Sequence, residues 1–147
     1  MDRGKPGSKL HLLSDANGLP LVVGVTAANT HDSEMFIPLL DGIPAIRSRR
    51  GPRRRRPAKL HADKGYDFAH CRQALRRRGI IPRIARRGIE SSERLGRHRW
   101  VVERTLAWFA RFRRIAVRYE RRADIFTAFH HIAASLICWR FVQRWFC

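Results

Sequence analysis

The stretch LHADKGYD, residues 60–67, contains the change of structure that decides the fold class. Its first residues belong to a short run, 58–63, that predicts a buried strand, and KGY predicts a turn. A carboxylate, Asp63, stands where the strand meets the turn. A basic helix at 67–78 and another short strand at 80–85 are predicted to follow. A strand, a helix and a second strand in this order are typical of an α/β sheet.

A β-hairpin is predicted further upstream. Residues 9–14 and 19–26 read as strands, and the second is rich in valine with a continuous apolar centre. Asn17 and Gly18, between them, form a dipeptide that strongly favours a hairpin turn. A hairpin followed by alternating strands and helices predicts an α/β fold whose sheet mixes antiparallel and parallel strands.

Three more helices are predicted. The first begins near residue 30, where Thr30 or Asp32 can cap it. The second spans 98–116, and the third spans roughly 124–146 and is apolar on most sides. The uninterrupted apolar run of the third helix is shorter than the roughly 20 residues that cross a bilayer. We therefore predict a core or interface helix there, and no membrane span.

The charge of the chain points to a polyanionic partner. Its 147 residues include 31 Lys and Arg against 12 Asp and Glu, which gives a net charge of +19. A folded domain tolerates such self-repulsion best when a polyanion neutralises it, so nucleic acid is the leading partner and an anionic membrane surface the second. Residues 47–57, RSRRGPRRRRP, hold seven arginines and no apolar side chain, which predicts a basic loop that cannot pack.

The cysteines favour a reducing compartment. Cys71, Cys138 and Cys147 are widely spaced, odd in number and form no CxxC pair. This pattern argues against a disulfide framework and against a structural zinc site. The first residues also lack the apolar core of a signal peptide, so we expect a cytoplasmic protein.

Two of the acidic residues, Asp63 and Glu103, have both a structural and a chemical interpretation, whereas the others fall at turns, loops, helix ends or the chain start. Asp63 is either a turn residue that accepts backbone hydrogen bonds or a metal ligand. Glu103 is either a solvated partner of Arg99 or a second metal ligand, with Ala107 and Ala110 leaving room beside it. Two Mg²⁺ ions about 4 Å apart, held by carboxylates, can assist in-line attack on a phosphodiester.

Three stretches together resemble a known family. They are GKPGSKLHLLSDANGLPLVVGVTAANTHDS from residue 4, KLHADKGYD from residue 59 and RHRWVVERTLAWFARFRRI from residue 97. In this order they resemble the C-terminal part of bacterial insertion-sequence DDE transposases, of the IS-five type. The resemblance covers about residues 3 to 142.

The resemblance implies a ribonuclease-H-like catalytic core with a mixed sheet and flanking helices, Mg²⁺ or Mn²⁺ as cofactor, and metal-dependent cleavage and transfer of DNA strands. It places the role of the second catalytic Asp on Asp63 and that of the catalytic Glu on Glu103, both as metal ligands. It also implies DNA at the ends of the insertion sequence as the partner, a homo-oligomer when the protein is intact, and association with the nucleoid.

The resemblance also suggests DNA contacts. Arg99 matches the basic residue of the family's signature around the Glu, although Gly96 stands where the signature has a Tyr. The signature's downstream basic residue is replaced by Ala110, with Arg111 next to it. We expect phosphate contacts from the following arginines: Arg99, Arg104, Arg111, Arg53, Arg54, Arg55 and Arg56.

The family's first catalytic Asp lies on a strand before the hairpin, and the sequence offers no counterpart on such a strand. We therefore expect residues 1–147 to form one partial catalytic domain, with a basic loop at 47–57 and without the N-terminal strand of the core. An upstream-frame transposase segment would supply the missing part. Alone, the chain is expected to bind DNA with little or no catalysis. The alternatives are a non-catalytic DNA-binding regulator, a decayed remnant, or a basic protein that associates with RNA or a membrane.

Overall fold

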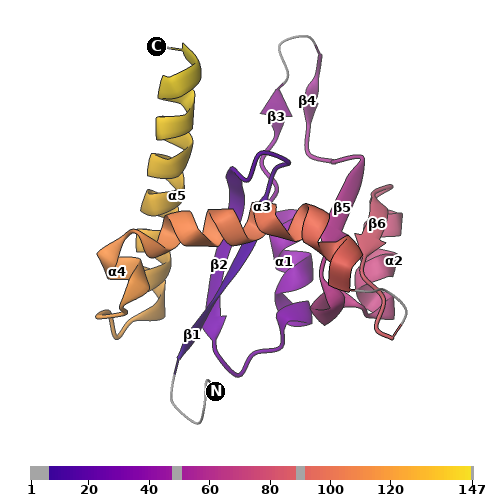
Figure 1. Ribbon diagram of the computed structural model, residues 1–147, viewed down its shortest axis with the longest axis horizontal. Helices are drawn as coiled ribbons and strands as arrows, with labels where there is room; N and C mark the ends of the chain where they lie inside the picture. The colour runs from indigo at the N-terminus through magenta and orange to yellow at the C-terminus, as the bar shows by residue number, and fades with distance from the viewer. Residues whose placement is uncertain (1–6, 48–50, 89–91, 147) are drawn as a thin grey trace. The chain divides into compact units, whose positions relative to one another are not determined.

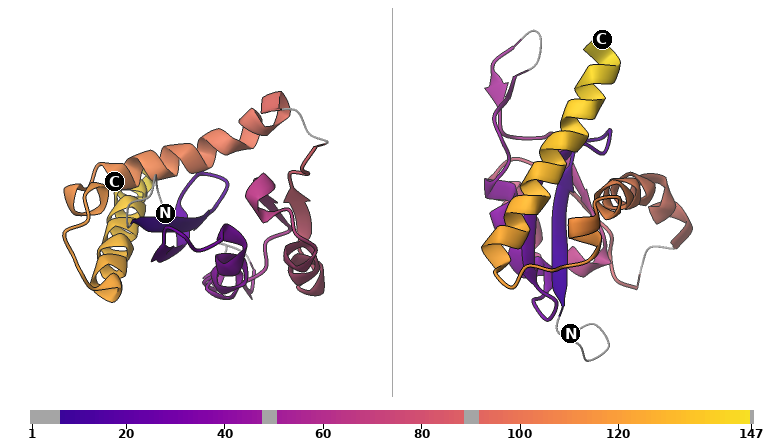
Figure 2. Two further views of the ribbon diagram at one scale, coloured as in Figure 1. Left: turned by 90° about the horizontal axis from the view of Figure 1, so that it is seen from below. Right: turned by 90° about the vertical axis from the view of Figure 1, so that its left-hand side faces the viewer.

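The computed structural model describes residues 7–47, 51–88 and 92–146, and for residues 92–99, 145 and 146 it describes the backbone alone. The chain divides into two compact units. The first unit contains residues 1–30 and 100–147, and the second contains residues 31–99. Each unit has its own strands and helices (Figures 1 and 2).

The first unit is a hairpin covered by helices. Its elements are β1 (Ser8–Ser14), β2 (Pro20–Ala27), the later part of α3 (Ser92–Ala110), α4 (Arg113–Ala116) and α5 (Ala123–Phe146). The strands β1 and β2 are antiparallel, as predicted. In the turn between them, Asp15 Oδ1 accepts hydrogen bonds from the backbone N–H groups of Asn17 at 2.9 Å and Leu19 at 2.8 Å. Gly18 has φ +81°, a conformation that favours glycine and explains its place in the turn.

The core of the first unit lies between β2, α3 and α5. Val23, Phe109, Ala133 and Ile137 form a buried cluster, with further apolar side chains packed against it. Phe109 and Thr105 of α3 are almost fully buried, so this face of the helix contributes to the core. α5 lies against β2 (Figure 1).

α5 is packed on one face only. Phe126, His130, Ala133 and Ile137 are buried, whereas an adjacent face exposes large apolar side chains. The residues on this face include Ile125, Ile132, Leu136 and Trp139, which are 42%, 56%, 41% and 59% exposed. On length and composition alone, Ala123–Arg144 could cross a membrane, but the core helices of soluble proteins meet the same test. The buried face confirms that α5 contributes to a core.

The second unit contains the strand–helix–strand segment. Its elements are η1 (Asp32–Met35), α1 (Phe36–Asp41), β3 (Ile46–Arg47), β4 (Arg53–Arg54), β5 (Lys59–Ala62), η2 (Lys64–Tyr66), α2 (Ala69–Arg77), β6 (Ile81–Ile84) and the start of α3. β5 and β6 are parallel, with Leu60 opposite Pro82, and α2 connects them as predicted. Cys71, Ala74 and Leu75 bury one face of α2, because residues three and four apart share a helix face.

The structure confirms an α/β chain with both antiparallel and parallel strand pairs. In the described residues the strands form three separate pairs, β1 with β2, β3 with β4, and β5 with β6. The ribonuclease-H-like arrangement stays a prediction. The segment 47–57 was predicted to be only a loop, and this is wrong in part, because Arg47 pairs with Arg53 and Ile46 with Arg54 in a short antiparallel hairpin.

Three helix boundaries also differ from the predictions. His31, not Thr30 or Asp32, caps η1, because its ring Nδ1 accepts a hydrogen bond from Ser33 N at 3.2 Å. α3 begins at Ser92, earlier than the predicted residue 98. It ends at Ala110, because Phe112 has an extended backbone and packs against the core cluster before α4 begins.

Candidate functional site

Asp63 lies at the carboxyl end of the parallel strand β5. It is exposed and occupies the N-cap position of η2. Its Oδ1 accepts a hydrogen bond from Gly65 N at 2.9 Å, which closes the turn. This confirms the interpretation of Asp63 as a turn residue, and the same bond holds its carboxylate at the edge of the strand pair.

A second carboxylate approaches the same turn. A Cβ on Gly65 would stand 3.0 Å from Asp63 Oδ1 and 3.5 Å from Asp32 Oδ2, so the absence of a side chain lets both acids come close. Burial, then the charges of Asp32 and Asp63, raise the pKa of Tyr66, so its phenol stays protonated. Asp32 was considered only as a helix-start residue, because its approach to Gly65 depends on the packing of η1 against η2.

Two contacts between aromatic rings hold the segments on either side of the turn at Asp63 and Gly65. Phe36 and Tyr66 lie with ring centroids 5.4 Å apart, and His31 meets Phe68 edge-on at 5.1 Å. Both contacts join the segment that contains η1 and α1 to the segment that follows Asp63. The turn therefore rests on a packed layer of the second unit.

Asp67, at the end of the same turn, binds Arg72 and the backbone of Arg87. Its Oδ1 pairs with Arg72 Nη2 at 2.5 Å, and its Oδ2 accepts from Arg87 N at 2.9 Å. The backbone bond from Arg87, followed by the hydrogen bond from Arg72, lowers the pKa of Asp67. Phe68, and not Asp67, occupies the N-cap position of α2.

Glu103 belongs to the first unit, where α3 is anchored to the hairpin turn. Its side chain is exposed, as are Ala107 and Ala110 on the same helix. The hydroxyl of Thr105 lies 2.7 Å from Gly18 O and 2.9 Å from Val101 O, and Thr105 is fully buried. This contact fixes the part of α3 that carries Glu103 on the turn between β1 and β2.

Arg104 strengthens the same anchor. Its Nη2 donates to Asn17 O at 2.6 Å, and its guanidinium lies 4.5 Å from the ring centroid of Trp100 and 5.0 Å from that of Trp108. Arginine stacked on aromatic rings stabilises a helix surface as well as binding anions. The predicted DNA contact at Arg104 stays a prediction, and the structure adds an architectural role for this side chain.

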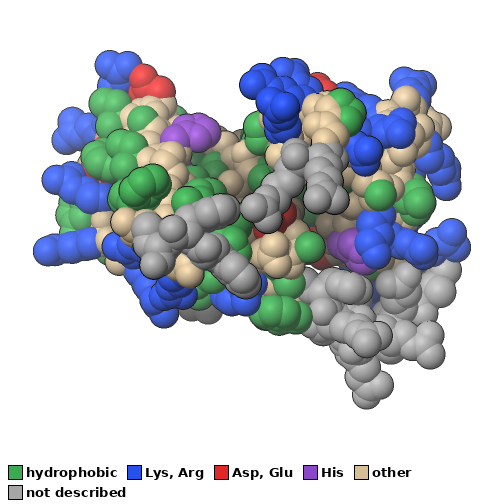
Figure 3. Space-filling model, turned by 90° about the horizontal axis from the view of Figure 1, so that it is seen from above, with side chains coloured by type: hydrophobic (Ala, Val, Ile, Leu, Met, Phe, Trp, Pro, Cys, Tyr) green, Lys and Arg blue, Asp and Glu red, His purple; other side chains and the backbone are tan. Residues whose placement is uncertain are grey.

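The other predicted DNA contacts are mostly exposed. Arg53 and Arg54 form β4, and Arg55 and Arg111 are also exposed. Arg56 is exposed, but its guanidinium lies close to Gly79. A Cβ added at Gly79 would stand 2.7 Å from Arg56 Nη1. The side chain of Arg99 lies outside the described residues. Lys and Arg side chains form several groups on the face shown in Figure 3, beside hydrophobic side chains, and Asp and Glu are few there.

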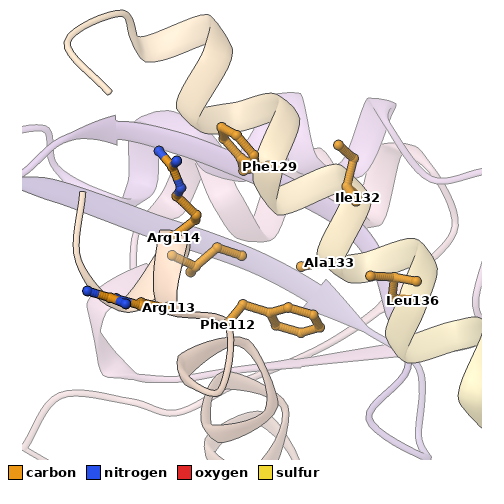
Figure 4. A pocket seen from close by; sticks show the side chains of 8 residues that line it. Phe112, Arg113, Arg114, Phe129, Ile132, Ala133 and Leu136 are labelled. Atoms are coloured by element: carbon orange, nitrogen blue, oxygen red, sulfur yellow. The ribbon is translucent and has the colours of Figure 1, made fainter. Parts of the chain in front are cut away.

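One apolar cavity lies in the first unit, between α4 and α5, with a volume of about 210 Å³. Its lining includes Phe112, Phe129, Ile132 and Leu136, with Arg113 and Arg114 beside them (Figure 4). It contains none of the predicted site residues. Within the parts of the chain that the structure describes, no three His, Cys, Asp or Glu side chains gather as a ready metal site. Carboxylate oxygens such as those of Asp63 are nevertheless the ligands that Mg²⁺ prefers.

The excess of Lys and Arg over Asp and Glu is typical of proteins that bind nucleic acid. The chain matches the family described as Transposase DDE domain over residues 1–138 and belongs to this family.

Two curated relatives are identical to this chain at about a third to a half of the aligned positions. The chain is 51% identical over 143 residues to a putative transposase for insertion sequence element IS402 from Burkholderia cepacia, which covers 97% of this chain and 68% of the relative. It is 30% identical over 129 residues to a transposase for insertion sequence element IS1106 from Neisseria meningitidis serogroup B, which covers 81% of this chain and 40% of the relative.

A third relative is similar over almost its whole length. The chain is 28% identical over 138 residues to a putative transposase for insertion sequence element IS6501 from Brucella ovis, which covers 88% of this chain and 96% of the relative. No solved structure matches the chain. The family is therefore that of insertion-sequence DDE transposases, and the IS-five type stays a prediction.

Proposed function

We propose that Asp63 and Glu103 are two of the carboxylates that hold Mg²⁺ or Mn²⁺ for DNA strand cleavage and transfer. The observation that carries this proposal is the placement of Asp63, whose carboxylate is held by Gly65 N directly after the parallel strand β5. The carboxyl ends of such strands are common places for ligand-binding residues in α/β proteins. Membership of the DDE transposase family supports the role.

The chain's own groups suit this chemistry. Asp63 is exposed and oriented by its turn, and Glu103 is exposed on a helix that Thr105 anchors. A bound divalent ion would activate water, and later a 3′-hydroxyl, for attack on a DNA phosphodiester. The arginines expected to contact DNA would hold phosphates, and their fixed fork geometry suits paired contacts with phosphate oxygens.

The third carboxylate is proposed to come from a transposase segment encoded upstream. The Burkholderia relative is longer than the part of it that the chain matches, which supports a contribution from additional sequence. We propose that the intact protein acts as a homo-oligomer on DNA at insertion-sequence ends, in the cytoplasm and at the nucleoid. By itself, the chain is proposed to bind DNA with little or no cleavage.

Metal binding can be tested without relying on catalysis. Fe²⁺ bound in place of Mg²⁺ is oxidised by added hydrogen peroxide, which gives hydroxide and a hydroxyl radical, and ascorbate reduces the Fe³⁺ again. The radicals cut the polypeptide near the metal, and the cut positions are read by mass spectrometry. We expect cuts beside Asp63 and Glu103 in the wild-type chain, and their loss at the altered position in Asp63→Asn and Glu103→Gln. Asp15→Asn is a matched control, because Asp15 also accepts a hydrogen bond at 2.9 Å from the N–H two residues on.

A DNA assay completes the test. Binding of duplex DNA and nicking with Mg²⁺ are measured for the chain alone and with the upstream segment. Nicking by the chain alone that Asp63→Asn abolishes would contradict the proposed need for that segment. DNA binding at insertion-sequence ends with no metal-directed cuts would instead favour a non-catalytic regulator.

A further inference from the structure

The hairpin of β3 and β4, here called the arginine hairpin, has no packed face. Its described residues are Ile46, Arg47, Arg53 and Arg54, and all four are exposed, including Ile46 at 48%. The arginine hairpin projects away from the other elements of the second unit (Figures 1 and 2). Because none of its described residues is buried, the hairpin receives little support from the rest of the fold. Two-stranded hairpins without such support are at best marginally stable in water.

The register adds repulsion to this weak support. Arg47 lies directly opposite Arg53, and Ile46 lies opposite Arg54. Like charges directly opposite each other destabilise an antiparallel pair, by up to about 1 kcal/mol. Opposite residues also share a face, so one face of the hairpin presents two guanidinium groups and the other presents one beside an isoleucine.

No acidic side chain compensates this charge in the described part of the second unit. The ion pairs there join Asp67 to Arg72 and Asp41 to Arg78, and neither reaches the arginine hairpin. A short, exposed, self-repelling hairpin is therefore best explained by an anionic partner that lies outside the described chain.

We propose that the arginine hairpin is an arm that binds duplex DNA, and that its two strands become firmly paired when phosphates neutralise Arg47, Arg53 and Arg54. The proposal rests on the proposed function for the identity of DNA as partner. It goes further by adding Arg47 to the expected contacts Arg53 and Arg54, by selecting duplex DNA, and by coupling the pairing of the two strands to binding.

The form of the arm favours duplex over single-stranded DNA. The major groove of a duplex, about 12 Å wide, admits a two-stranded ribbon, and arginines on both faces of the ribbon can reach phosphates of both strands. Single-strand binding instead depends on aromatic side chains that stack on bases. The four described residues of the arginine hairpin include no aromatic side chain.

The first test compares two triple variants with the same loss of charge. One replaces Arg47, Arg53 and Arg54 by Gln, and the control replaces three exposed arginines of α2 and β6. The control substitutions are Arg76→Gln, Arg77→Gln and Arg83→Gln. Fluorescence anisotropy with a labelled 30-base-pair duplex, its single strand and an RNA duplex is recorded over a range of salt concentrations.

The hairpin variant is expected to lose at least tenfold in affinity for the DNA duplex. The slope of log K against log salt should fall by up to about 2.7, because each lost phosphate contact removes about 0.9. The control should lose less than threefold. Equal losses of affinity in both variants would refute the proposal that the arginine hairpin binds duplex DNA. Tighter binding of the single strand or the RNA duplex than of the DNA duplex by the wild type would also refute it.

A second variant separates DNA contact from hairpin stability. Arg53→Glu places an acid opposite Arg47, so it should weaken duplex binding while slowing amide hydrogen exchange in the free protein at the one of Ile46 and Arg47 whose N–H points toward β4. In the wild type, DNA should slow the same exchange. Unchanged exchange on binding would refute the coupled folding. A wild type that binds no duplex at all would instead overturn the proposed function, so the two failures are distinguishable.

Discussion

Thr105→Val should destabilise the first unit much more than the same change at Thr127. Both hydroxyls lie within hydrogen-bond distance of the carbonyl four residues earlier, at 2.9 Å for Thr105 and 2.8 Å for Thr127. Thr105 is fully buried and also lies 2.7 Å from Gly18 O, in the turn between β1 and β2. Valine keeps the shape of threonine and removes the donor, so the Gly18 carbonyl loses this partner.

The expected loss of unfolding free energy follows from the Gly18 carbonyl, which loses its donor. Leaving a buried acceptor without its donor costs about 1–3 kcal/mol. At a urea dependence of about 2 kcal/mol per molar, a loss of 2 kcal/mol lowers the unfolding midpoint by about 1 M. Thr127→Val should change the free energy of unfolding by less than about 0.5 kcal/mol, as is usual for surface substitutions.

Tryptophan fluorescence reports the unfolding of the first unit selectively. The four tryptophans are Trp100, Trp108, Trp139 and Trp145, and all belong to the first unit. Urea titrations of the wild type and the two valine variants then give the two shifts directly. Equal midpoints for Thr105→Val and Thr127→Val would show that the bond to the turn does not hold α3 in place.

Three other substitutions and modifications have defined outcomes. Gly18→Ala should lower the unfolding midpoint in the same fluorescence titration, because φ of +81° costs about 1–2 kcal/mol and the new Cβ would lie 2.8 Å from Thr105 Oγ1. Gly65→Ala should weaken Fe²⁺-directed cutting beside Asp63, because its Cβ would press on Oδ1 at 3.0 Å; undiminished cutting would contradict the role of this glycine. Cys71 is fully buried and burial raises the pKa of its thiol, so iodoacetamide at pH 8 should label it at least a hundredfold more slowly in the native protein than in urea, as peptide mass spectrometry can show.

The parts of the fold that depend on neighbours in sequence could be predicted. Asn17 and Gly18 predict the hairpin turn, and Leu60 and Ala62, which alternate with polar residues, predict β5, because turn chemistry and side-chain periodicity are local. α5 could be predicted from its composition in the same way. The break after Ala110 could not be predicted, because it depends on Phe112 turning into a core that other elements build.

The candidate site shows the same division. The turn role of Asp63 follows from its place before Gly65, whereas its metal role and that of Glu103 come from the family resemblance. The approach of Asp32 to Gly65 could not be predicted, because it joins residues that are far apart in the sequence. The arginine hairpin was missed as a pair of strands, because β-propensity rules expect β-branched or aromatic residues there.

The exposed flank of α5 has a consequence for anyone who purifies this protein. A net charge of +19 keeps the molecules apart at low salt, but it also retains nucleic acid from the cell. Concentrated salt removes the nucleic acid and shortens the range of the repulsion to about 3 Å at 1 M. The same step then lets Ile132, Leu136 and Trp139 of different molecules meet, so the cleanest preparation is also the one most inclined to precipitate.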